Sequence, residues 1–353
     1  MSLITYMTRV HFADRALEDA LPVEVGNLGV RRPLVLTDVV GESGDSYDRL
    51  VDALPSTCAV VALRGHAPQP TAREHAAATT TFSRSGCDGI VCLGGDGLID
   101  FARLTVCSKS AGGDAPVIAV PTITAGMGLA PVRHQPAVEG PPRAPVPAAV
   151  ICDPTLTTSA GADVTAAAGM DVLTHCLEAW LGAAFNPPAD GIALEGLRRA
   201  AGSLERAVAD GSDLEARREL MAAALCAGLA AQKGAGGVEA LARAAEAEAG
   251  LVGLHGLLHA ALLPVVLAFN APAVADRLDQ VRAALQLPAE ADLGAALAAL
   301  GARVALPSRL GRFGFDARAR ARIAATAVAD PANRTNPRHA TPADYLHLLE
   351  AAD

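Results

Sequence analysis

The segment 169–179, Gly-Met-Asp-Val-Leu-Thr-His-Cys-Leu-Glu-Ala, combines an apolar helical pattern with two side chains that can bind a metal ion. Asp171 and His175 are four residues apart, which places both side chains on one face of a helix, one turn apart. A carboxylate and an imidazole in apolar surroundings are costly unless they are paired, hydrogen-bonded or bound to a metal. This helix is therefore the first candidate for a functional site.

Two more histidines share this spacing. His255 and His259 lie in the apolar segment 253–264, again at i and i+4. Two histidines and one carboxylate can hold a divalent cation. A single histidine on an apolar helix is more often an ordinary core residue, and the sequence alone does not show that the two helices meet. A metal site and a pair of core helices therefore both stay open at this point.

Two turns are candidates for cofactor binding. The segment 94–97, Gly-Gly-Asp-Gly, follows an apolar run and precedes a helical pattern, so its backbone N–H groups can approach a phosphate. Its Asp96 would repel a pyrophosphate unless the carboxylate points away or meets a cation or a hydroxyl. The segment 121–126 offers the hydroxyls of Thr122 and Thr124. In both segments an ordinary turn without a ligand is the alternative.

Up to about residue 154, short apolar runs alternate with helical patterns, which predicts a parallel, doubly wound sheet with ligands at the carboxyl ends of its strands. Asp38 ends one of the predicted strands. The capping pair Thr71 and Glu74 indicates the start of a helix. The expected strands are 33–38, 58–63, 89–93, 116–120 and 148–153, and the expected helices are 43–54, 71–85 and a helix from the glycine turn to residue 104.

From about residue 155 the chain becomes rich in Ala, Leu, Glu and Arg with a period near 3.6 residues, which predicts helices almost throughout. We therefore expect an α/β dinucleotide-binding domain over 1–154 and an all-helical domain over 155–353. The proline-dense segment 129–147 predicts a loop or an edge hairpin.

Composition excludes several classes of protein. The chain has 353 residues, of which 51% are hydrophobic and 19% charged, so a large core is possible. A net charge of −9 without a basic run argues against binding to nucleic acid or a membrane surface. No signal peptide is evident, and the best membrane-span candidate, 251–269, is interrupted by Gly, His and Pro. Seven scattered cysteines predict reduced thiols in a cytoplasmic protein.

The order and spacing of these motifs resemble the iron-containing alcohol dehydrogenase superfamily over nearly the whole chain, and most of all its maleylacetate reductases. The segment 169–179 is similar to GMDALTHAIEA, 94–103 to GGGSxxDxAK and 121–126 to PTTYAG. Further similarities link 66–68 to His-Val-Pro, 153–157 to DPxLT, 255–270 to a HAxxH…LP…N run and 336–341 to NPRxxT.

This resemblance implies a dehydroquinate synthase-like fold, in which an N-terminal dinucleotide-binding domain with a parallel sheet precedes an all-α domain and the active site lies between them. Members transfer hydride between NAD or NADP and a carbonyl or alcohol. A cytoplasmic homodimer acting on a small molecule, away from nucleic acid and membranes, is the family expectation. The residues expected at the cofactor are Asp38, Gly94, Gly95, Asp96, Gly97, Asp100, Thr122 and Thr124.

The resemblance also assigns metal ligands, because many members bind iron or zinc through one Asp and three His. The fourth family ligand falls near Leu241, and a further histidine close to the nicotinamide falls near Ala245, in a segment without histidine. Glu246 or Glu248 can substitute if the register shifts. The positions that this chain fills are Asp171, His175 and His255.

Several family positions are changed. Asp96 and Gly97 replace the third Gly and the Ser of the phosphate loop, and Met127-Gly128 replace the Ser-Glu of the reductases. Changes at functional positions within an intact hydrophobic framework predict a changed or lost activity rather than a changed fold.

The function expected from this resemblance is that of an NAD(P)H-dependent reductase of the maleylacetate reductase type, acting on a small carboxylated carbonyl or enoate. Its candidate catalytic residues are His255 and His259 as proton donors, together with Asp171. Arg338 and Arg133 are candidate partners of a substrate carboxylate. A non-redox lyase, isomerase or cyclase that uses the inherited site and a catalytically silent protein are the alternatives.

Overall fold

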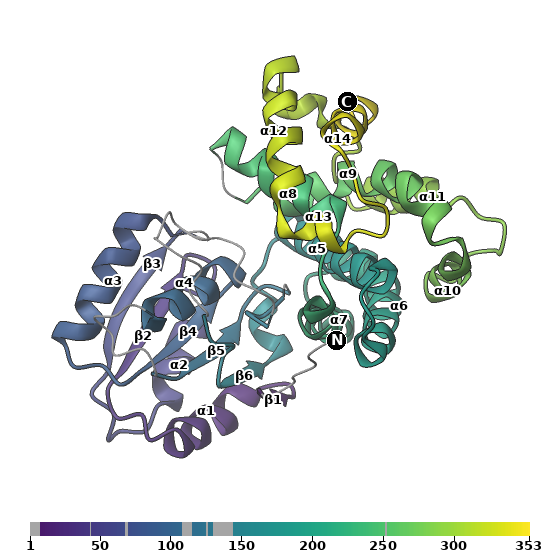
Figure 1. Ribbon diagram of the computed structural model, residues 1–353. Helices are drawn as coiled ribbons and strands as arrows, with labels where there is room; N and C mark the ends of the chain where they lie inside the picture. Colours follow the sequence, from purple (N-terminus) through teal and green to yellow (C-terminus); the bar gives the residue numbers. More distant parts are fainter. Residues whose placement is uncertain are drawn as a thin grey trace. The chain divides into compact units, whose positions relative to one another are not determined.

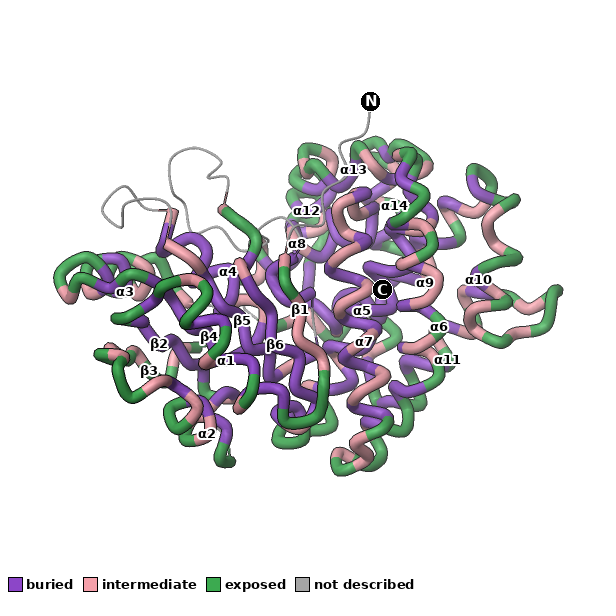
Figure 2. Tube along the Cα trace, turned by 90° about the horizontal axis from the view of Figure 1, so that it is seen from below, coloured by how far each residue is buried: buried purple, intermediate pink, exposed green. Residues whose placement is uncertain are grey.

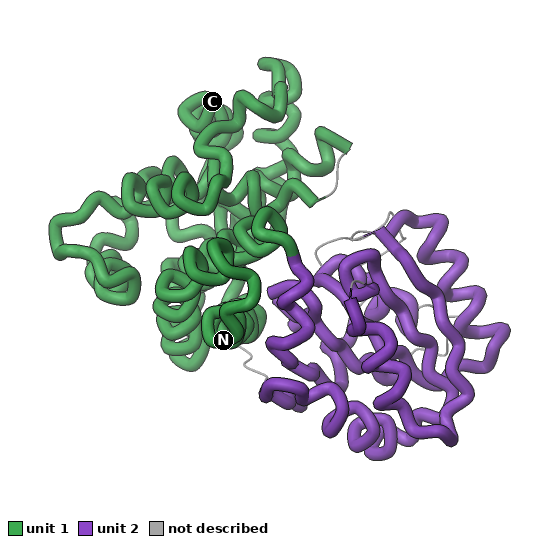
Figure 3. The backbone as a smooth tube through the Cα atoms, turned by 180° about the vertical axis from the view of Figure 1, so that it is seen from behind, with its two compact units in different colours: residues 1–4, 161–353 green, residues 5–160 purple. Residues whose placement is uncertain are grey.

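The structure is a computed structural model that describes residues 8–42, 44–67, 70–107, 115–124, 126–129, 144–250 and 253–353. The chain divides into two compact units (Figure 3). One unit extends to Ala160 and contains the strands, and the other begins at Gly161 and is helical (Figure 1). The α/β domain followed by a helical domain that the sequence predicts is thus confirmed as a fold class.

The first unit is built on a six-stranded sheet in the order β1-β6-β5-β4-β2-β3, in which every pair is parallel. The four central strands are fully buried, as expected for continuous apolar runs in a parallel sheet that is covered on both faces (Figure 2). The strands are β1 Arg9–Phe12, β2 Pro33–Asp38, β3 Val61–His66, β4 Gly89–Gly94, β5 Val117–Pro121 and β6 Ala149–Cys152.

The helices of this unit connect the strands. The Thr71 side chain accepts from the Glu74 amide and Glu74 accepts from the Thr71 amide, so the predicted capping box is confirmed. The third strand begins at Val61 rather than at residue 58, because its ladder with β2 begins where Val61 pairs with Leu34; the Ala59 amide donates to Arg31, which precedes β2. The helices are α1 Ala16–Asn27, α2 Ser46–Ala53, α3 Ala72–Arg84 and α4 Asp96–Cys107.

The glycine turn is tighter than the sequence predicts. Helix α4 begins at Asp96, so only Gly95 lies between β4 and α4, and Gly97 belongs to the first helical turn. A Cβ on Gly94 would lie 2.5 Å from a carboxylate oxygen of Asp38, which leaves room for glycine alone. The backbone at this point therefore packs directly against the end of β2.

The second unit consists of helices joined by short connections and 3₁₀ turns. Helix α5 lies at its centre and packs against α6, α7 and α9; every residue from Ala168 to Ala179 is buried (Figure 2). The α-helices are α5 Ala162–Leu181, α6 Pro187–Ala209, α7 Leu214–Ala230, α8 Gly237–Ala249, α9 His255–Asn270, α10 Leu278–Ala284, α11 Leu293–Arg303, α12 Ala317–Ala329, α13 Pro331–Thr335 and α14 Pro342–Ala351.

All seven cysteines are free, and none is exposed. Within the described residues, one stretch, His255–Ala273, is long and apolar enough to cross a membrane by length and composition. It contains α9, of whose 16 residues 11 are buried, as is typical of a core helix.

Helices α5 and α9 approach closely at Gly256. A Cβ on Gly256 would lie 2.5 Å from the carbonyl carbon of Ala167 and closer still to its oxygen, and backbone atoms cannot yield as a side chain does. We expect Gly256→Ala to lower the free energy of unfolding by about 3 kcal/mol, as measured by urea denaturation.

The matched control is Gly202→Ala in α6, where an added Cβ meets nothing within 4 Å. This change should raise stability by about 0.5–1 kcal/mol, because alanine is the better helix former. Equal unfolding midpoints for the two variants would contradict the close approach of α5 and α9.

Candidate metal centre

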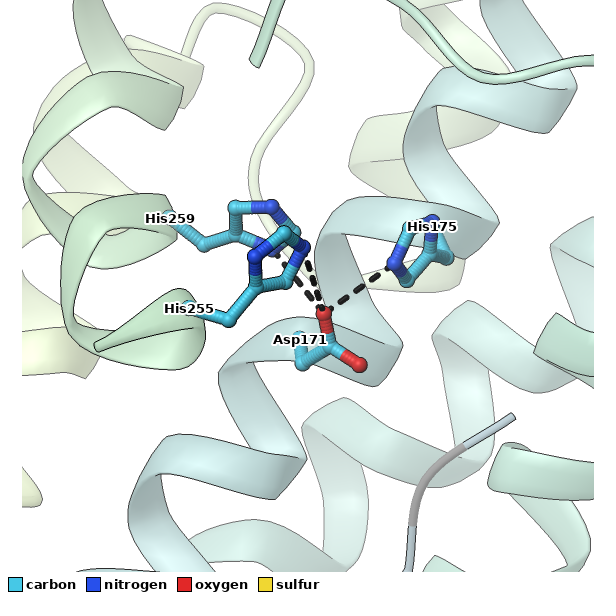
Figure 4. A group of neighbouring side chains, drawn as sticks. All are labelled: Asp171, His175, His255 and His259. Atoms are coloured by element: carbon cyan, nitrogen blue, oxygen red, sulfur yellow. Dashed lines mark ion pairs between the residues drawn. The ribbon is translucent and has the colours of Figure 1, made fainter. Parts of the chain in front are cut away.

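Two packed helices bring the predicted metal-binding side chains together. Asp171 and His175 project from α5, and His255 and His259 project from α9 (Figure 4). All four are buried, and their ligand atoms lie within 4.8 Å of one another. Asp171 Oδ1 is 3.0 Å from His175 Nε2, 3.2 Å from His259 Nδ1 and 3.8 Å from His255 Nε2. The helices thus meet, and both i,i+4 pairs face a common centre.

Glu239 on α8 is a fifth member of this group, and the sequence analysis missed it. Its carboxylate is fully buried, and its Oε2 lies 2.7 Å from His255 Nε2, 3.3 Å from His259 Nε2 and 3.6 Å from His175 Nε2. A signal was present: Glu239, Arg243 and Glu246 fall at i, i+4 and i+7, so they form one polar stripe on an alanine-rich helix.

The other residues on α8 correct the expectation about the missing ligand. Leu241 and Ala245 are fully buried apolar residues. Glu246 Oε2 lies 3.1 Å from His255 Nδ1, whereas the other ring nitrogen, Nε2, faces Asp171 and Glu239. Glu248 pairs with the exposed Arg322. The substitution expected from Glu246 or Glu248 is therefore wrong, because the helical phase of α8 directs Glu239 into the centre instead.

The group has a strong preference for positive charge. Burial lowers the pKa of His255, but the carboxylates of Glu239 and Glu246 outweigh this effect and raise the pKa to about 10. Burial raises the pKa of Glu239, yet His255, Arg243 and His175 together hold that pKa well below its usual range. The carboxylates around the imidazoles thus favour positive charge in this centre.

The residues present fit a divalent metal ion. Neither ring nitrogen of the fully buried His259 makes a well-formed hydrogen bond, although each has a carboxylate oxygen at 3.2 or 3.3 Å. Imidazole nitrogens and carboxylate oxygens are the donors that Zn²⁺ and Fe²⁺ accept in proteins. The donor set thus suits an ion, and either that ion or a substrate hydroxyl beside it would give the His259 nitrogens the partner that their desolvation requires.

The start of α8 is held in place by residues from two of the recognised motifs. Glu178 accepts hydrogen bonds from the amides of Val238 and Gly236 at 2.7 and 2.9 Å. Asn336 Oδ1 accepts from the amide of Gly237 at 3.0 Å. Burial raises the pKa of Glu178 to about 7. These contacts fix the backbone immediately before Glu239.

Of the two arginines expected near a substrate carboxylate, Arg338 lies within the described residues. The Arg338 guanidinium lies over the Phe269 ring, 3.9 Å from its centroid, and donates to the Phe269 carbonyl at 3.2 Å. Its role toward a substrate stays a prediction. Arg133 lies outside the described residues.

In the α/β unit, Asp38 joins the ends of two strands. Its buried carboxylate accepts from the amides of Gly95, Gly41 and Val40 at 2.8, 2.7 and 3.1 Å. Burial raises the pKa of Asp38, and the three amides partly offset this effect. The carboxyl ends of β2 and β4 are thereby held together, where Gly94 begins the phosphate-loop motif.

The sequence places the carboxylate of Asp96 in the turn expected to bind a pyrophosphate, and in the structure this carboxylate has backbone partners. It accepts from the amides of Gly126 and Met127 at 2.7 and 2.6 Å, so it is neutralised by backbone dipoles of the threonine turn. Met127 adopts a left-handed conformation, with φ of 57°. Asp96 therefore ties α4 to the segment after β5.

The remaining cofactor candidates lie at or near the same edge of the sheet. Thr122 and Thr124 are buried, and the Thr122 hydroxyl has no hydrogen-bond partner among the described residues. Asp100 pairs with Arg103 at 2.7 Å, and Arg103 also donates to the Pro145 carbonyl. Their contacts with a nucleotide stay a prediction.

Comparison with known proteins agrees with this geometry. The family profile described as iron-containing alcohol dehydrogenase matches residues 7–133. The profile described as Fe-containing alcohol dehydrogenase family, C-terminal, matches residues 165–352. The chain belongs to the iron-containing alcohol dehydrogenase family. It is therefore a member of a family of oxidoreductases that use NAD(P) and a metal ion.

Individual relatives cover nearly the whole chain. A 4-hydroxybutyrate dehydrogenase from Cupriavidus necator is 36% identical over 99% of each chain. Maleylacetate reductase 2 from Cupriavidus pinatubonensis is 31% identical over 95% of this chain and 91% of its own. The crystal structure of a 1,3-propanediol oxidoreductase superposes with a TM-score of 0.89 at 25% identity, over 99% of this chain and 100% of the other.

The buried Glu178 makes stability depend on pH. Its pKa of about 7 in the folded protein lies above the ordinary value of 4.5. The free energy of unfolding that it contributes is therefore full below pH 4.5 and falls as pH rises toward 7. We expect wild-type protein, relative to Glu178→Gln, to lose stability between pH 5 and pH 7.5 in chelator-treated samples, as measured by urea denaturation.

Glu248→Gln is the control, because Arg322 lowers the pKa of Glu248. The free energy of unfolding of wild type, relative to that of Glu248→Gln, should not fall between pH 5 and pH 7.5. If the difference between wild type and Glu178→Gln is the same at both pH values, Glu178 does not titrate in this range.

Proposed function

We propose that this protein is an NAD-dependent dehydrogenase of a small hydroxy acid, with 4-hydroxybutyrate or a close analogue as substrate. The observation that carries the proposal is the buried convergence of Asp171, His175, His255 and His259. It occurs in a chain that is 36% identical, from end to end, to a 4-hydroxybutyrate dehydrogenase. The reaction oxidises the terminal alcohol to an aldehyde, and hydride passes to the nicotinamide.

The substrate class follows from two relatives whose names specify carboxylated compounds. One is a 4-hydroxybutyrate dehydrogenase and the other a maleylacetate reductase, so a small carboxylated substrate is common to both. The maleylacetate reductase type expected from sequence is the less supported of the two, because identity to that relative is 31% rather than 36%. Arg338 remains our candidate for binding the carboxylate.

The metal centre supplies the polarisation that the reaction needs. Asp171, His175 and His255 would hold a divalent ion, which would supply Lewis acidity toward the substrate oxygen. His259 is the imidazole that the resemblance leaves outside the ligand set. Its ring lies against two carboxylates, which stabilise the protonated form. We therefore propose that His259 accepts the proton that leaves the alcohol.

The charge at the end of β2 favours NAD over NADP. Asp38 and the nearby Glu42 place two carboxylates at this edge, and Glu42 accepts a hydrogen bond from Thr37 on β2. Arg64 pairs with Glu42 at 2.9 Å, so the charge of Asp38 is the one that disfavours a 2′-phosphate here, whereas a ribose hydroxyl is compatible with it. We therefore propose NAD rather than NADP as the physiological cofactor.

Purified protein loaded with Fe²⁺ or Zn²⁺ should reduce NAD⁺ with 4-hydroxybutyrate, faster than with NADP⁺, as followed by absorbance of NADH. Asp171→Ala should no longer bind stoichiometric metal, because the carboxylate that faces all three histidines is removed. Its kcat/KM should fall by more than about 99%, on the order of 3 kcal/mol of transition-state stabilisation.

The control for this loss is Asp279→Ala, since Asp279 is 80% exposed and pairs only with Arg282 in the described contacts. Its activity should equal that of wild type. Failure of NADH and NADPH to bind in calorimetry would refute the redox function and favour a non-redox or silent protein.

The proton-transfer role of His259 is tested separately. His259→Asn should lower kcat by about 10²-fold or more while the metal content stays near wild type, because general acid–base catalysis contributes that much. The measurements are steady-state kinetics and elemental analysis of the same sample. Loss of metal in this variant would instead make His259 a ligand.

A further inference from the structure

Glu239 is a fully buried carboxylate on α8 that lies outside the motifs recognised in the sequence. Its side chain is fully buried and points into the group formed by Asp171 and the three histidines. We propose that Glu239 binds the metal ion directly, as the ligand that α8 contributes to the centre. The inference rests on the proposed function only in requiring an ion at this position, and its test measures binding rather than turnover.

The geometry places two carboxylates around the same imidazole nitrogens. His175 Nε2 lies 3.0 Å from Asp171 Oδ1 and 3.6 Å from Glu239 Oε2. His255 Nε2 lies 3.8 and 2.7 Å from the same two oxygens. Asp171 Oδ1 and Glu239 Oε2 are therefore the two oxygens that would join these nitrogens in holding an ion.

Arg243 determines which oxygen Glu239 presents. The Arg243 Nε atom is 2.8 Å from Glu239 Oε1, one helical turn along α8. That contact leaves Oε2 directed at the histidines. Glu239 also lies in the first turn of α8, where the helix dipole stabilises a negative charge. The carboxylate is thus oriented and kept ionised, as a metal ligand requires.

Buried hydrogen bonds hold the backbone immediately before Glu239 in place. The amides of residues 236, 237 and 238 donate to the buried side chains of Glu178 and Asn336. A Cβ on Gly236 would lie 2.6 Å from Glu178 Oε1, so this segment accepts only glycine there without rearrangement. Support of this kind from neighbouring residues is what holds a ligand within the tolerance of a metal site.

The position of Glu239 on α8 differs from the position that the family motif spacing indicates. Counting by family spacing points to Leu241 and Ala245, whereas Glu239 and Arg243 lie two residues earlier with the same separation of four. Two residues correspond to about 200° around a helix, so Leu241 faces away from Glu239. Leu241 is accordingly a buried core residue.

Glu246 acts on the same site from outside. Its Oε2 lies 3.1 Å from His255 Nδ1, so it accepts the proton of that nitrogen and leaves the Nε2 lone pair for the ion. Glu246 is therefore a positioning residue for His255, and its loss should weaken metal binding less than the loss of Glu239.

The test measures the affinity of the metal-free full-length protein for Zn²⁺ alone, in competition with a chromogenic chelator. Loss of an outer partner typically weakens metal affinity about 10- to 100-fold, and we expect this range for Glu246→Gln. Glu239→Ala should exceed about 100-fold because a ligand itself is removed. Glu248→Gln, on the same helix but paired with Arg322, should bind like wild type.

A second readout separates a ligand from a structural residue. Bound Co²⁺ reports its coordination through its visible absorption spectrum. Glu239→Ala and Glu239→Gln should both change this spectrum, whereas Glu246→Gln and Glu248→Gln should preserve it. Far-UV circular dichroism of each variant identifies any that does not fold, and Glu239→Gln then carries the test because it keeps the size of the side chain.

Two results would overturn the inference. In the first, both Glu239 variants fold and match wild type in Zn²⁺ affinity and in Co²⁺ spectrum. In the second, the wild-type protein binds neither ion. The proposed function fails differently: a protein that binds Zn²⁺ through Glu239 but neither oxidises hydroxy acids nor binds NADH would keep this ligand and lose that function.

Discussion

Mutual neutralisation of buried charge is the interaction on which the helical unit depends. Asp171 and Glu239 are carboxylates removed from water, and three imidazoles surround them. Ionised groups are costly in such surroundings unless counter-charges lie within a few ångströms. The packing of α5, α8 and α9 brings these groups together. The packing of these helices and the pairing of the buried charges therefore depend on each other.

Several recognised motifs serve this centre by positioning rather than by contact with an ion. Glu178, from the same helix as Asp171, and Asn336, near the carboxyl terminus, hold the start of α8. Gly256 lets α9 approach the backbone of α5. Motif residues that look catalytic in sequence thus include some whose task is to maintain the geometry of others.

The carboxylates of the α/β unit have an analogous structural task. Asp38 and Asp96 accept backbone amides from segments that follow other strands, so they join the carboxyl ends of β2, β4 and β5. Asp96 departs from the family glycine, and its charge is satisfied by two amides. This departure is therefore compatible with an ordered loop and does not by itself indicate lost activity.

The sequence by itself determined the parallel sheet, the capping box at Thr71, the helical second half and the i,i+4 pairs of Asp171 with His175 and His255 with His259. These features depend on local periodicity, which a sequence records directly. Only the tertiary structure decided that α5 and α9 meet, that Asp96 turns toward backbone amides, and that Glu239 rather than Glu246 or Glu248 enters the centre. The physical reason is that these outcomes depend on the register between distant helices and loops. A displacement of two residues in one helix changes which side chain faces the core.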